Sequence, residues 1–343
     1  MSALSQQNNK RIAKNTLLLY FRMLFSMGIG LFTSRIVLES LGIEDYGIYN
    51  LVGGIVTIFA FLNSAMIATS QRFISYELGK GNLHKLKDVF CTTLTIHIAI
   101  AFIIVVLSEV IGVWFLNTKL NIPSDRMMAA NWTLQLSIFV FAVNVISVPY
   151  NASIVAHEKM SAFAYISIFE VSLKLAIAYL LLFISYDKLI VYSILVFCVA
   201  LLLRSLYCFY CKRHFEECHY TFSFNIEQFR EMFAFAGWSL VGNLGFSFKD
   251  QLSNILLNLF FGTVVNAARG ISVQVGSLIN SFSANFMMAM NPQITKSYAV
   301  GDLYRSKELV YAGCRFSFYL LAVISLPIMI NITSVSYTHL RAH

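Results

Sequence analysis

Charged residues and proline are scarce in this chain. Only 12% of its 343 residues are charged, and 4 prolines and 17 glycines interrupt it, whereas about a quarter of an ordinary soluble domain is charged. Hydrophobic residues make up 58% of the chain. A soluble core cannot bury that much apolar surface, so the solvent for most of it must be lipid. The composition excludes a soluble domain and predicts an all-α polytopic membrane protein.

Recognised catalytic patterns are also lacking. No nucleotide-binding glycine loop, nucleophile elbow or zinc-protease motif lies on a suitable frame. One cluster has metal-like spacing, but along one continuous helix it would form a stripe too long to surround a single ion. The sequence therefore predicts no enzyme and no resident cofactor or metal. The members of the cluster are Cys208, Cys211, His214, Cys218 and His219.

Nine apolar runs are each long enough to cross a ~30 Å hydrocarbon layer as a helix. The first run is too long for a cleavable signal peptide and carries Arg22 and Arg35. We therefore expect nine membrane spans. They are residues 15–37, 47–69, 91–115, 128–155, 162–184, 188–210, 235–258, 264–290 and 314–333.

The basic residues of the connecting segments lie almost entirely on one side. With the N-terminus in the cytoplasm, fourteen fall in inner segments and three, Lys119, Arg126 and Lys188, in outer loops. Because positive residues are retained inside, this bias predicts a cytoplasmic N-terminus. It also accounts for the net charge of +8 without a nucleic-acid partner. The cysteines fall in spans or near the cytoplasmic side, where disulfides are not expected.

One stretch of the chain occurs twice. Residues 72–90 (RFISYELGKGNLHKLKDVF) and 292–310 (PQITKSYAVGDLYRSKELV) align without gaps at an offset of 220 residues. Six predicted spans separate the copies, an even number, so both copies would have one orientation in the membrane. The repeat predicts two parallel lobes of six helices. Identical pairs are Ile74 and Ile294, Gly81 and Gly301, Leu83 and Leu303, and Lys87 and Lys307.

The repeat also sets the predicted domains. A cytoplasmic N-terminus (1–14) precedes a first lobe (15–210), a cytoplasmic linker (211–234) and the first three helices of a second lobe (235–333). Nine spans of an expected twelve are thus present. The last ten residues, 334–343 (SVSYTHLRAH), follow an abruptly ended apolar run and resemble a non-native tail. We therefore expect a C-terminally truncated fragment.

Polar side chains gather on the first, seventh and eighth spans. They can serve helix–helix hydrogen bonding, but the stripe on the seventh span favours a wet cavity between the lobes. Asn243, Asn254 and Asn280 are candidate substrate-binding residues on these faces. The complete stripe of the seventh span is Asn243, Ser247, Asp250, Asn254 and Asn258.

Charges within spans are stronger signals, because each costs about 2.5–3.5 kcal/mol at the bilayer centre on insertion scales. Glu170 and Lys174 lie one helical turn apart, and either neutralise each other or form an ion relay. Arg22 and Arg269 then remain as cations on polar faces. A cationic cavity suits an anionic substrate, such as a phosphate-bearing lipid head group.

The run SRIVLESLGIEDYGIYNLVGGIV (34–56), followed by SQRFISYELGKGN (70–82), resembles the polysaccharide flippases of the MOP (multidrug/oligosaccharidyl-lipid/polysaccharide) exporter superfamily, with Wzx-like O-antigen and capsule translocases as nearest kin. The resemblance covers about residues 8–333. It implies twelve spans in two six-helix lobes and a cavity open to one side at a time. It also implies movement of an undecaprenyl-diphosphate-linked oligosaccharide to the outer leaflet of a bacterial inner membrane, for surface polysaccharide or lipopolysaccharide synthesis.

The resemblance further implies roles for single residues. Basic cavity residues are typical of such flippases, so Arg22 and Arg269 would bind the diphosphate. Asp250 or Glu109 would couple transport to H⁺ or Na⁺. The implied partners are the lipid-linked oligosaccharide, inner-membrane lipids and polysaccharide-assembly proteins.

Three other functions fit the sequence less well. A MATE-type exporter of organic cations would need net acidic residues deep in the cavity, and the charge balance here leans the other way. A membrane glycosyltransferase or O-antigen polymerase would need a large outer loop, but the longest one, 116–127, is short. A structural scaffold would not need charges at membrane depth.

Overall fold

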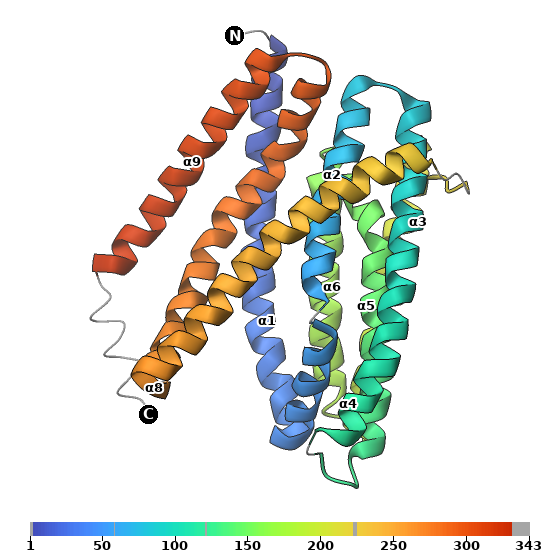
Figure 1. The fold of residues 1–343 in the computed structure, drawn as a ribbon, viewed down its shortest axis with the longest axis vertical. Coiled ribbons are helices and arrows are strands. Elements are labelled where there is room, and N and C mark those ends of the chain that lie inside the picture. Colours follow the sequence, from blue (N-terminus) through green and yellow to red (C-terminus); the bar gives the residue numbers. More distant parts are fainter. Residues whose placement is uncertain (1–2, 58, 121, 222–224, 331–343) are drawn as a thin grey trace. The chain divides into compact units, whose positions relative to one another are not determined.

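The computed structural model describes residues 3–330 apart from 58, 121 and 222–224 (Figure 1). These residues are almost entirely helical and contain no strand, so the all-α prediction is confirmed. The helices are α1 (Ala3–Thr57), α2 (Ala60–Lys80), α3 (Leu83–Leu107), α4 (Val113–Thr118), α5 (Met127–Ala156), α6 (Met160–Leu180), α7 (Lys188–His214), α8 (Ile226–Ala299) and α9 (Leu303–Ile330). A π-helical turn, η1 (Ser108–Gly112), joins α3 to α4, and a 3₁₀ turn, η2 (Glu216–Cys218), follows α7.

Six helical stretches of the described chain are long and apolar enough to cross a membrane, which makes the protein a multi-pass membrane protein. The predicted second span (47–69) is divided between α1 and α2, and the predicted spans 235–258 and 264–290 both lie in α8. The total of nine spans remains a prediction. The six stretches are Asn9–Val56, Leu83–Thr118, Met127–Ala156, Met160–Leu180, Lys188–His214 and Leu303–Pro327.

The two longest helices each contain more than one straight segment. Gly42 interrupts α1 with φ 80° and ψ 170°, a conformation that glycine adopts without a steric penalty. Figure 1 shows α8 folding back on itself, so its yellow and orange parts are two arms.

The chain forms two compact units. One is Phe21–Asn243, and the other combines Met1–Tyr20 with Leu244–His343. The start of α1 belongs to the second of these, because Ile12 is buried among residues of α8 and α9. The start of α8 belongs to the first, because Met232 is buried among residues of α2 and α3. These limits differ from the predicted lobes, 15–210 and 235–333, whose boundaries stay predictions; the tail 334–343 lies outside the described residues.

Helix α5 is central to the unit Phe21–Asn243, where it packs against α2, α3, α6 and α7. Its fully buried side chains include Leu134, Ile138 and Ile154. Small buried residues such as Ala130 and Ala156 let neighbouring backbones approach closely, which is a main source of helix association in lipid.

The two copies of the repeat form the same turn. Gly81 (φ 73°) ends α2 and Gly301 (φ 84°) ends α8 in the left-handed conformation that favours glycine. The next residue caps the following helix in both copies: Asn82 Oδ1 accepts from the amide of Lys85 at 3.1 Å, and Asp302 Oδ1 accepts from the amide of Arg305 at 2.9 Å. The sequence repeat therefore corresponds to one repeated local structure.

Candidate substrate site

Arg22 of α1 lies in a group of charged and aromatic side chains from α6 and α7. Its guanidinium carbon is 4.9 Å from the centroid of the Phe163 ring. Glu170 and Tyr207 are close enough to interact with it electrostatically. Lys174 Nζ lies 2.6 Å from Glu170 Oε1. We refer to Arg22, Phe163, Glu170, Lys174 and Tyr207 as the Arg22 cluster.

Glu170, the carboxylate of the Arg22 cluster, lies halfway along α6. Glu170 follows Met160 by ten residues, about 15 Å along α6 at 1.5 Å per residue. Two cations share one carboxylate, so the ionised cluster carries a net charge of +1. The side chains of Glu170 and Lys174 are 34% and 42% exposed, so the rest of the chain does not enclose this ion pair. An anion with several oxygens could compete with Glu170 for both cations.

The sequence predicted only part of this arrangement. From the sequence, Glu170 and Lys174 either neutralise each other or form an ion relay, and the structure contains the ion pair between them. The approach of Arg22 to Glu170 was not predicted, because these residues are far apart in the sequence and only the packing of α1 against α6 and α7 brings them together.

Glu109, another candidate of this unit, lies in the π-helical turn η1. Its Oε2 accepts a hydrogen bond from Gln135 Nε2 of α5 at 2.8 Å. π-helical turns inside α-helices occur frequently at functional sites. The pairing supplies Glu109 with a partner from a neighbouring helix that sequence reasoning did not identify.

The remaining candidate residues are placed as follows. Asn243 Nδ2 donates to Ser64 Oγ of α2 at 3.3 Å. Arg269 is half-buried and Asn280 is exposed, both on α8 in the other unit. The side chains of Asp250 and Asn254 lie outside the described part of the structure. That all these residues meet around one cavity remains a prediction.

A small cavity of about 170 Å³ lies within the unit Phe21–Asn243, between α1, α5 and α7. Tyr49, Asn144 and Ser193 supply polar atoms to its wall. Pockets for organic ligands usually measure roughly 300–1,000 Å³. This cavity therefore suits water or a small ion better than an oligosaccharide.

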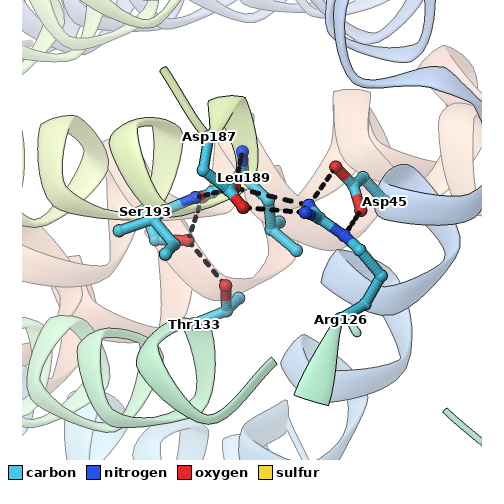
Figure 2. A network of polar contacts seen from close by, with 7 residues as sticks. Asp45, Arg126, Thr133, Asp187, Leu189 and Ser193 are labelled. Atoms are coloured by element: carbon cyan, nitrogen blue, oxygen red, sulfur yellow. Dashed lines mark hydrogen bonds and ion pairs between the residues drawn. The ribbon is translucent and has the colours of Figure 1, made fainter. Parts of the chain in front are cut away.

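Arg126 contacts the carboxylates of Asp45 and Asp187, two residues of the same unit that are far from it in the sequence (Figure 2). Its Nε donates to Asp45 Oδ1 at 2.7 Å, and its Nη2 also contacts Asp45. Its Nη1 donates to Asp187 Oδ2 at 2.7 Å. Asp187 in turn caps α7 by accepting from the amides of Leu189 and Ile190. We refer to Arg126, Asp45 and Asp187 as the Arg126 clamp; all three lie at ends of spans predicted to face outward.

The clamp shifts the titration of its members. The hydrogen bond to Asp187 and the contacts with Asp45 raise the pKa of Arg126, although partial burial opposes them. Partial burial alone would raise the pKa of Asp187, but the hydrogen bonds from Arg126 and from the backbone of α7 outweigh it and lower that pKa. Both shifts favour the charged forms.

The cysteine–histidine cluster does not follow one continuous helix. α7 ends at His214, and η2 then turns the chain. Cys211 and Cys218 are both buried within one hydrophobic cluster. Across the described residues, no three His, Cys, Asp or Glu side chains are arranged to hold a metal ion. Glu217 instead pairs with His157, whose Nε2 lies 2.6 Å from the carboxylate.

The fold is that of known transporters. The structure of the Vibrio cholerae MATE transporter VcmN in its bent form matches 98% of this chain and 77% of its own, with a TM-score of 0.83 and 14% identity. A MOP superfamily transporter from Pyrococcus furiosus matches 96% of this chain and 74% of its own, with a TM-score of 0.74 and 14% identity. The chain therefore has the same fold as these transporters.

Sequence comparison gives the family. Residues 12–296 match the family described as polysaccharide biosynthesis protein, and the chain belongs to it. The membrane protein EpsK of Bacillus subtilis (strain 168), whose function is uncharacterised, is 19% identical over 305 residues, or 88% of this chain. The chain spans 59% of the length of that relative. The resemblance to polysaccharide members of the MOP superfamily is confirmed.

Proposed function

We propose that this chain is part of a flippase that moves an undecaprenyl-diphosphate-linked oligosaccharide from the cytoplasmic to the outer leaflet of a bacterial inner membrane, with its N-terminus in the cytoplasm. The observation that carries the proposal is the net positive Arg22 cluster, whose carboxylate, Glu170, lies halfway along α6. Membership of the polysaccharide biosynthesis protein family supports a glycan-linked substrate.

The Arg22 cluster would bind the diphosphate by exchange of ionic partners. Lys174 is held by Glu170 at 2.6 Å when no anion is present, so the cost of a free charge in lipid is reduced. A diphosphate offers several oxygens to the planar guanidinium of Arg22 and to the ammonium of Lys174. Binding would release Glu170 from Lys174, and Phe163 would keep the guanidinium in place through its ring face.

Transport would follow the alternating exposure of this cluster to the two sides of the membrane. Arg269, Asn243, Asn254 and Asn280 are proposed as further substrate contacts. Glu109 and Asp250 are proposed to bind the coupling ion, H⁺ or Na⁺. Inner-membrane lipids and polysaccharide-assembly proteins are the partners that such a role requires.

A cation-coupled multidrug exporter is the second candidate. It is favoured by the solved MATE structures that share the fold. In that case, Glu170 and Glu109 would bind the cationic substrate, and Arg22 would oppose it. The two candidates thus predict opposite effects of removing Arg22.

A reconstitution assay distinguishes them. The chain, extended to the length of its relatives, is placed in proteoliposomes with a diphosphate-linked glycolipid in one leaflet, and its exposure to a membrane-impermeant reagent on the other side is followed. We expect protein-dependent exposure that falls at least tenfold in Arg22→Gln and is retained in Arg35→Gln, an exposed arginine of the same helix. Unchanged flipping in Arg22→Gln would refute the assignment, and gradient-driven efflux of a cationic dye would establish the exporter.

A further inference from the structure

Arg204 of α7 is another arginine at membrane depth in the unit Phe21–Asn243. It lies inside the predicted span 188–210 and ten residues, about 15 Å, before α7 ends at His214. An arginine near the inner end of a span usually extends to the membrane surface, where water solvates its guanidinium. Arg204 departs from this pattern, because its side chain is only partly exposed and its Nη1 is buried.

The guanidinium of Arg204 lacks the protein partner that burial requires. Nη1 forms no hydrogen bond with any described residue, and no described carboxylate forms an ion pair with this side chain. Its electrostatic neighbour is the uncharged phenol of Tyr150 on α5. A buried charged donor without a partner is costly, so an arginine kept in this state at membrane depth points to an anionic ligand.

Arg204 adjoins the Arg22 cluster along α7. Tyr207, a buried member of that cluster, follows Arg204 by three residues, so the two side chains are neighbours on the surface of one helix. Tyr207 interacts electrostatically with both Arg22 and Glu170. The cations Arg22 and Arg204 therefore lie next to the same residue of α7, one contacting it from α1 and the other preceding it by one turn.

The charge of this combined group matches two phosphates. Arg22 and Lys174 share the carboxylate of Glu170, which leaves a net charge of +1, and Arg204 adds a second unmatched cation. A diphosphate that is esterified at both ends carries one negative charge on each phosphate, whereas a lipid-linked sugar monophosphate carries one in all. Each phosphate of the diphosphate can thus pair with one cation, and a planar guanidinium binds two oxygens of a phosphate at once.

We propose, on the basis of the flippase function proposed above, that Arg204 binds the second phosphate of the diphosphate while the Arg22 cluster binds the first. The two positions together select a lipid diphosphate over a lipid monophosphate, because a single phosphate leaves one of the two cations without a counter-ion. Tyr150 adds no charge beside Arg204, so the ligand supplies the only negative charge there among the groups described. Arg204 is a specificity-determining residue of the substrate site.

Equilibrium binding to the purified chain, extended to the length of its relatives, tests this selectivity without requiring transport. The probes are a short-chain polyprenyl diphosphate sugar and the matching polyprenyl monophosphate sugar in one detergent. We expect wild type to prefer the diphosphate. Arg204→Gln should bind the diphosphate about tenfold more weakly, the loss expected for one hydrogen-bonded charge, and the monophosphate equally well. Arg204→Lys should restore part of the preference.

Arg213→Gln is the matched control, because Arg213 is an exposed arginine in the last turn of the same helix. Thermal unfolding then separates a binding role of Arg204 from a structural one. Arg204→Met keeps the length of the side chain and removes an unsatisfied charge, so its Tm should equal or exceed that of wild type. A Tm clearly below that of wild type would mean that Arg204 stabilises the fold, and would overturn the assignment.

Flipping of the same two lipids in proteoliposomes distinguishes failure of this inference from failure of the proposed function. If wild type flips the diphosphate lipid and Arg204→Gln behaves like Arg213→Gln with both lipids, the flippase function stands and Arg204 does not select the substrate. If wild type flips neither lipid but binds the diphosphate through Arg204, the flippase function fails and the binding assignment stands. Equal affinity of wild type for the two lipids would refute the selectivity directly.

Discussion

The Arg126 clamp permits a prediction whose size can be worked from the structure. Arg126→Gln removes the cation that holds Asp45 and Asp187 together and leaves two carboxylates facing each other. The three side chains are 22%, 16% and 31% exposed. Breaking a fully buried pair costs about 3–5 kcal/mol, and an exposed pair contributes about 0–1 kcal/mol. Intermediate burial places the loss at about 2 kcal/mol.

The assay is thermal unfolding of the purified chain in one detergent at pH 7. A loss of about 2 kcal/mol corresponds to a decrease in Tm of roughly 4–8 °C for a unit of this size. Lys119→Gln serves as the control, because it removes a predicted outer-loop cation that forms no part of the clamp. Asp45→Asn combined with Arg126→Gln should recover part of the loss, since it removes one of the facing charges.

The same reasoning predicts how the stabilisation by the Arg126 clamp depends on pH. The folded pKa of Asp187 is lowered, so its contribution to stability is present above its unfolded pKa of about 3.9 and is lost as the pH falls through the folded value. The difference in Tm between wild type and Arg126→Gln should thus be full at pH 7 and shrink below about pH 4. A difference that is absent at pH 7, or that grows on acidification, would refute the account.

Three further predictions concern other parts of the chain. Gly81→Ala and Gly301→Ala should each destabilise the protein by about 1 kcal/mol, because both positions have positive φ; equal Tm values for wild type and variants would contradict this. Asn82→Ala should cost about 1 kcal/mol through loss of the helix cap, and Asn82→Asp should not, as unfolding in the same detergent will test. Glu109→Gln in the extended chain should weaken the dependence of transport on the ion gradient, whereas Gln135→Ala should change the apparent affinity of transport for the coupling ion. Full retention of gradient dependence in Glu109→Gln would exclude Glu109 as the ion site.

The class of the protein follows from features that lipid imposes directly on the sequence. Long apolar runs and scarce charge were sufficient to predict helices across a membrane, and the fold has them. The repeated Gly–Asx turn was also visible, because a positive φ and a helix cap each require particular residue types. Such local requirements can be recognised without knowledge of the packing.

The contacts of the candidate residues depend on how the helices pack against one another, and the sequence alone did not predict them. Glu109 is bonded by Gln135, and Arg22 approaches Glu170, in both cases across helices whose relative rotation the sequence does not state. Arg126 appeared only as one of three outer cations, although Asp45 and Asp187 surround it. The prediction for the cysteine–histidine cluster assumed that one continuous helix carries it, whereas α7 ends at His214 and the chain then turns.

The boundary between the two units falls between Asn243 and Leu244, inside α8. A continuous helix, and no loop, thus carries the chain from one unit to the next at this point. Gly242 and Gly245 border the boundary, and a Cβ built on either one would meet no atom within 4 Å. Neither glycine is required by close packing, although each lowers helix stability by about 1 kcal/mol relative to alanine. α8 therefore carries two helix-weakening residues at the point where the chain passes from one unit to the next.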